Sequence, residues 1–197
     1  MMHEERFIET LYGWAAVRDQ PTRDGARARA NLAILRRGRG KTLDESVELY
    51  PIVEQYLPHD APRWEAERLY LVASLFAAHL TPWRDPPPYT NFGTALRRYV
   101  ERQVAADNDV RDSVNRRFVA LLECDREELP DHLRHMTTLL AEQEIDWHSL
   151  LRDLRSWRGN VPHRWAGEFY RPPVVLPAFD DEREPAASVA AAAEPSI

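Results

Sequence analysis

Cysteine, lysine and long apolar runs are almost missing from this sequence. Cys124 is the one cysteine in 197 residues, so no internal disulfide can form. No apolar run approaches the roughly 18 residues that a membrane-spanning helix needs, and no signal-peptide pattern is present. These absences predict a soluble, cytoplasmic protein without membrane contacts. Cys124 is expected to pack at a helix end rather than to act as a nucleophile.

Strand patterns and catalytic motifs are scarce as well. Only VVLP, at residues 174–177, has the composition of a strand, and it is brief. The sequence contains no glycine-rich phosphate loop, no nucleophile elbow and no HExxH metal motif. We therefore expect a protein that is not an enzyme and that needs no cofactor.

One enzymatic alternative stays open. Glu128, His132 and His135 have the i, i+4 and i+7 spacing that places side chains on one helix face. Such a face could hold a metal ion, as in a metal-dependent hydrolase. In the simpler interpretation these histidines are partly exposed helix residues beside core leucines. Metal analysis of the pure protein would separate the two.

Helical periodicity, in contrast, recurs over most of the chain. Helices are expected at residues 4–18, 22–37, from about 60, 92–106, 109–124, 128–143, 146–158 and 161–170. Thr42 and Glu45 form a capping-box pattern that opens a further segment, which Pro51 should break or kink. The sequence thus predicts an all-α helical bundle.

The predicted bundle has two small packed lobes. Four prolines between residues 81 and 91 forbid regular structure there, so the boundary is placed between residues 1–85 and residues 86–177. Residues 178–197 are acidic, rich in alanine and free of aromatic residues apart from Phe179, which predicts a disordered tail. Residues 180–197 alone contribute −4 of the formal net charge of −6.

Charge of one sign is concentrated near the N-terminus. Residues 23–41 hold six arginines and one lysine against Asp24 alone, a local charge of +6 in an acidic protein. Ion pairs with acids elsewhere in the fold would be one explanation. A surface for a polyanion would be the other, since the arginine fork suits phosphate. Further basic residues recur later in the chain, at Arg111, Arg116, Arg117 and Arg134.

Three segments of the sequence are distinctive: ARANLAILRRGRGK, then LPDHLRHMTTLLAEQEIDWHSLLRDLRSW, then VPHRWAGEFY. The first resembles the N-terminal basic helix, and the other two the C-terminal signature, of the CasB family, the small subunit of the type I-E CRISPR complex Cascade. The resemblance covers roughly residues 4–172. It implies an all-helical, non-catalytic subunit of an RNA-guided surveillance complex in antiviral defence.

The resemblance also implies partners and sites. The partners would be the other Cascade subunits, CRISPR RNA, a second copy of this chain and the displaced strand of target DNA. The implied task is sequence-independent stabilisation of the R-loop, through the displaced strand and the guide–target duplex. The nucleic-acid-binding residues would be Arg36 and Arg37 first, then Arg27, Arg29, Arg39 and Lys41, then Arg111, Arg116, Arg117 and Arg134. A helical DNA-binding regulator is the main alternative, and it would require sequence-specific affinity.

Overall fold

The computed structural model describes residues 3–79, 90–104, 108–157 and 159–171, and every regular element in these ranges is a helix. The elements are α1 (His3–Val17), α2 (Arg23–Arg37), the 3-10 turn η1 (Val47–Leu49), α3 (Tyr50–Val53), the 3-10 turn η2 (Glu54–Tyr56), α4 (Arg63–Ala78), α5 (Phe92–Val104), α6 (Asn108–Glu123), α7 (Leu129–Leu139), α8 (Trp147–Arg155) and α9 (Val161–Phe169). The predicted all-α class is confirmed. The VVLP segment, the tail and most of the proline-rich segment lie outside the described residues.

The N-terminal half of the bundle forms around α2. Thr22 caps this helix, because its side-chain oxygen accepts a hydrogen bond from the Gly25 amide. Ala28, Leu32 and Leu35 form the buried stripe of α2, at the helical spacing that the sequence shows. The opposite face is left to the arginines, which are exposed.

The segment after α2 agrees with its prediction. The Glu45 carboxylate accepts hydrogen bonds from the Thr42 amide and hydroxyl, at 2.9 and 3.0 Å, so the predicted pairing of these residues exists. The predicted break near Pro51 is present as well. Pro51 has no amide to donate, and the segment is divided into η1, α3 and η2. Helix α4, expected from about residue 60, begins at Arg63 and has Pro62 at its N-cap.

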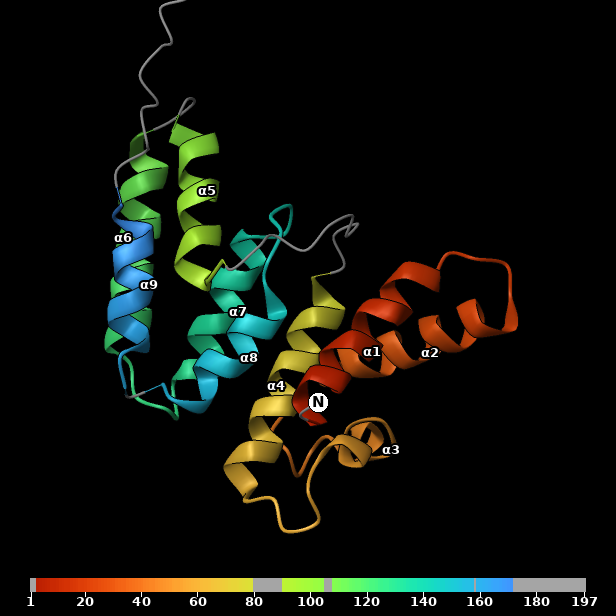
Figure 1. Ribbon diagram of the computed structural model, residues 1–197. Coiled ribbons are helices and arrows are strands. Elements are labelled where there is room, and N and C mark those ends of the chain that lie inside the picture. The colour runs from red at the N-terminus through yellow and green to blue at the C-terminus, as the bar shows by residue number, and fades with distance from the viewer. Residues whose placement is uncertain (1–2, 80–89, 105–107, 158, 172–197) are drawn as a thin grey trace, which may run out of the picture.

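Helix α4 is central to the arrangement (Figure 1). It packs on α2 on one side and on α8 on the other, while α5, α6 and α9 form a separate three-helix group at the far end. Helices α7 and α8 connect the two groups, since α7 packs on both α6 and α4. The two-lobe division at residue 85 therefore stays a prediction, because α8 contacts helices of the first half.

Candidate nucleic-acid interface

Three of the six arginines in residues 23–41, called the basic segment below, bind carbonyl oxygens. Arg29 donates to the carbonyls of Arg18 and Gln20, directly after the end of α1. Arg36 donates through Nε to the carbonyl of Ala77, 3.0 Å away in the last turn of α4. Because the last carbonyls of a helix have no partner within it, each of these guanidiniums stabilises a helix end.

Arg39 joins the two halves of the chain. Its Nη2 donates to the carbonyl of Arg134, 3.2 Å away on α7, and to the hydroxyl of Thr138. The turn that carries Arg39 needs two glycines for different reasons. A Cβ on Gly38 would lie 2.7 Å from the Leu49 side chain, and Gly40 has φ of 86°.

The other three candidate residues of the basic segment, Arg37, Arg27 and Lys41, bind no carbonyl oxygen within the described ranges. Arg37 forms an exposed ion pair with Glu48, at 3.1 Å. Arg27 and Lys41 are exposed, and within the described ranges neither side chain has a hydrogen-bond or ion-pair partner. Among the six residues of this segment that were predicted to bind nucleic acid, an acid thus pairs with one and carbonyls engage three.

This difference leads to a stability prediction. Arg36→Ala is expected to lower the free energy of unfolding by about 1.5 kcal/mol, because the Ala77 carbonyl loses a charged donor. Arg37→Ala should cost less than about 0.5 kcal/mol, because its ion pair is exposed. Urea unfolding of the two variants would measure the difference. Equal costs would contradict the assignment of separate roles.

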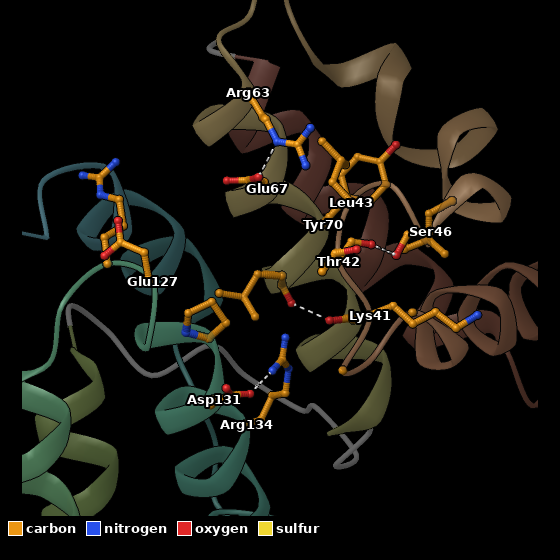
Figure 2. Close-up of a pocket in the computed structure, with 17 residues that line it drawn as sticks. Lys41, Thr42, Leu43, Ser46, Arg63, Glu67, Tyr70, Glu127, Asp131 and Arg134 are labelled. Atoms are coloured by element: carbon orange, nitrogen blue, oxygen red, sulfur yellow. Dashed lines mark hydrogen bonds and ion pairs between the residues drawn. The ribbon is translucent and has the colours of Figure 1, made fainter.

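A groove lies beside the Gly38–Lys41 turn, between α4 and α7 (Figure 2). Its volume is about 480 Å³, and its lining includes Lys41, Arg63, Glu67, Arg126, Glu127, Asp131 and Arg134. Arg134 is paired with Asp131, and Arg63 with Glu67 at 2.8 Å (Figure 2). The groove is therefore mixed in charge, with two of its cations already paired.

A second cavity, of about 380 Å³, lies on the other side of the Arg39 contact and is named the Arg36–Arg39 cavity below. Its lining consists of Arg36, Arg39, Ala78, His79, Thr137, Thr138 and Ala141. Among the described residues no carboxylate lines it. Burial lowers the pKa of His79, and its Nε2 contacts the Leu140 carbonyl. The ring is therefore neutral at pH 7, and among the described lining residues the two guanidiniums set the charge of the cavity.

The basic residues of α6 form a separate surface. Arg111, Arg116 and Arg117 are exposed, and none has a side-chain partner within the described residues. Helix α6 lies at the opposite end of the molecule from α2 (Figure 1). The structure thus gathers Arg36, Arg39, Lys41 and Arg134 at the junction of α2 and α7, whereas the α6 residues lie apart.

Sequence reasoning missed Trp64. This half-exposed indole packs against the guanidiniums of Arg68 and Arg126, at 5.7 and 5.6 Å from its ring centroid. Arg68 is itself buried and donates to the Leu151 carbonyl at 3.0 Å. The cluster holds α4, α8 and the α6–α7 connection together. The i, i+4 spacing of Trp64 and Arg68 on α4 could have indicated their contact, whereas Arg126 and Leu151 come from distant segments that no local pattern connects.

The metal alternative receives no support from the arrangement. Within the described parts of the chain, no three histidine, cysteine, aspartate or glutamate side chains are grouped closely enough to hold a metal ion. Cys124 follows the end of α6, as predicted, and burial raises its pKa to about 11. Its thiol therefore stays protonated at neutral pH. None of the described helices is long and apolar enough to cross a bilayer.

Comparison with known proteins then decides the family. The profile of the family described as CRISPR-associated protein Cse2 matches residues 31–170, which include the Gly38–Lys41 turn, the groove beside it and α6 to α9. The chain belongs to the Cse2 family. The resemblance to CasB is thereby confirmed, since solved structures called CasB have the same fold as this chain.

Individual relatives agree with this assignment. A CRISPR-associated protein Cse2 of Thermus thermophilus is 36% identical over 124 residues, which are 61% of this chain and 66% of that protein. The crystal structure of M. ruber CasB is 30% identical, with a TM-score of 0.64, covering 86% of this chain and 93% of that one. A chain from a structure described as a CRISPR RNA-guided surveillance complex shares the fold, with a TM-score of 0.65, 23% identity, and coverage of 86% and 92%.

Proposed function

We propose that this Cse2-family chain is a non-catalytic subunit of a CRISPR RNA-guided surveillance complex, in which it holds nucleic acid by the phosphate backbone. The family match over residues 31–170 carries the proposal. The ligands are the displaced strand of target DNA and the guide–target duplex. Exchange of DNA pairs for guide–target pairs is nearly balanced, so modest backbone contacts are enough to favour the R-loop.

The exposed cations support this function better than a base-reading one. Arg27, Lys41, Arg116 and Arg117 carry charge into solvent without an internal partner in the described ranges. Contacts of this kind neutralise phosphates and carry no sequence information. The net charge of −6 does not oppose binding, because the local field determines where a strand lies.

The assembly follows the same proposal. The chain acts with other subunits of the complex and CRISPR RNA, and two copies lie side by side so that their basic surfaces follow one strand. The two-lobe division at residue 85 belongs to this proposal, with α2 and α6 presenting the cations of each lobe.

Arg116→Glu/Arg117→Glu tests the proposed function. The double variant should fold normally, because both side chains are exposed and without partners in the described part of the chain. Its affinity for single-stranded DNA should fall at every sequence. The slope of log affinity against log salt concentration should become less steep by about 1.4, which is about 0.7 for each lost phosphate contact. Fluorescence anisotropy at several salt concentrations measures both quantities.

The matched control is Arg6→Glu, another exposed arginine, on α1, compared with the single variants Arg116→Glu and Arg117→Glu. Equal effects of all three would mean that only net charge matters, and the site assignment would fail. Strong dependence on DNA sequence would instead support a regulator. In the assembled complex, the double variant should weaken target binding and leave guide loading intact.

A further inference from the structure

The Arg36–Arg39 cavity differs from the groove in Figure 2 by its charge. The groove contains Glu67, Glu127 and Asp131 among its lining residues, whereas the described residues around the cavity include two arginines and no acid. A water molecule occupies about 30 Å³ in the liquid, so 380 Å³ can hold an oxyanion with several waters. Of the two spaces, the cavity is the one suited to an anion.

The two guanidiniums keep donors for a ligand. Each has five N–H groups. Arg36 uses Nε on the Ala77 carbonyl, and Arg39 uses Nη2 on the Arg134 carbonyl and the Thr138 hydroxyl. The other nitrogens have no hydrogen-bond partner among the described residues. These protein contacts hold both forks in place before a ligand arrives, which lowers the cost of ordering them on binding.

Helix ends do not cancel this charge. The C-termini of α2, α4 and α7 meet at the cavity, and each contributes a partial negative charge of about one half. Two full guanidinium charges exceed that sum. Thr137, buried in the wall, also has a hydroxyl with no partner among the described groups.

We propose that the Arg36–Arg39 cavity binds one phosphodiester group of the nucleic-acid strand, a proposal that rests on the function proposed above. Arg36 and Arg39 donate to its two free oxygens from positions set by the helix ends. The cavity thereby holds one phosphate at a set place, and the exposed cations of α2 and α6 are left to follow the rest of the strand.

Ala141→Glu tests the site without removing any existing side-chain contact of the two arginines. Ala141 is exposed and lines the cavity, so a glutamate there can pair with the two guanidiniums and exclude phosphate. Affinity for single-stranded DNA should fall about tenfold or more, the effect of losing a charged hydrogen-bonded contact. The salt slope should flatten by about 0.7.

Two control variants separate the site from general charge effects. Ala141→Gln has nearly the same size and should bind like the wild type. Ala16→Glu adds the same charge on α1, away from the cavity, and screening should limit its effect to less than about twofold at 0.15 M salt. If Ala141→Glu behaved like Ala16→Glu while the wild type still bound DNA, the cavity proposal would be overturned and the proposed function would stand.

Nuclear magnetic resonance of the wild type gives an independent test. The Nε–H signals of Arg36 and Arg39 should shift on addition of single-stranded DNA, and millimolar inorganic phosphate should compete for the same shift. The Arg27 signal should not respond to inorganic phosphate. A response of Arg36 and Arg39 to inorganic phosphate but not to DNA would identify free phosphate as the ligand and contradict the strand assignment. No response to either would show that the cavity binds no phosphate.

Discussion

Replacing Gly93 with alanine is expected to lower the free energy of unfolding by about 3 kcal/mol, well above the cost of an ordinary surface substitution. Gly93 is the second residue of α5, where that helix meets α9. A Cβ there would lie 2.1 Å from the carbonyl oxygen of Trp165 and 2.8 Å from its carbonyl carbon. Backbone cannot rotate away as a side chain can, so the two helices must separate. The melting temperature should fall by about 10 °C.

Gly167→Ala is the matched control. Gly167 lies on α9, the helix that Gly93 of α5 contacts, but no atom lies within 4 Å of a Cβ at position 167. Alanine there should raise the free energy of unfolding by about 0.5–1 kcal/mol, because it restricts the unfolded chain. Thermal unfolding followed by circular dichroism measures both variants. If the two alanines had similar effects, the close approach of α5 and α9 would be wrong.

Asp153→Ala should have an effect of similar size, a loss of about 3 kcal/mol in the free energy of unfolding. Asp153 is 2% exposed and accepts hydrogen bonds from the Trp165 indole, at 2.7 Å, and from Arg164. Removal of the carboxylate leaves the buried indole N–H without an acceptor. The same carboxylate joins α8 to α9, so its loss also weakens that contact.

Two further variants separate the parts of this interaction. Asp153→Asn keeps an oxygen acceptor for the indole and should cost about 1 kcal/mol less than Asp153→Ala. Arg164→Ala should cost less than about 1 kcal/mol, because its side chain is about half exposed. Denaturant titrations give all three values. A cost for Arg164→Ala equal to that of Asp153→Ala would show that the ion pair, rather than the indole bond, dominates.

The arginines of the basic segment have two kinds of role. Arg29, Arg36 and Arg39 bind carbonyls and hold helices in place, whereas Arg27 and Lys41 are exposed and without partners in the described parts of the chain. A guanidinium can do both, because it carries five donors and one carbonyl contact uses only one. For Arg36 and Arg39, a loss of DNA binding must therefore be interpreted together with stability.

The sequence by itself determined the helical class and most helix positions. Period-3.6 stripes such as Ala28, Leu32 and Leu35 need only local geometry to bury one face, and these residues are buried. Helix ends were less accurate: α7 was predicted to reach residue 143 and ends at Leu139. Apolar residues continue past that point, but Leu140 leaves the helical conformation and its carbonyl contacts His79.

In the candidate nucleic-acid interface, too, the sequence determined some features and the tertiary structure decided the others. Its chemistry, arginine concentrated without local acids, was readable from the sequence because charge is a property of composition. Only the tertiary structure decided which arginines bind carbonyls and which remain without a partner among the described residues. It alone also decided that Arg39 meets Arg134. The Arg39–Arg134 contact joins residues 95 positions apart, and local periodicity contains no information about which helix ends meet. The Arg36–Arg39 cavity exists for the same reason, since three helices must end together before two guanidiniums can face one space.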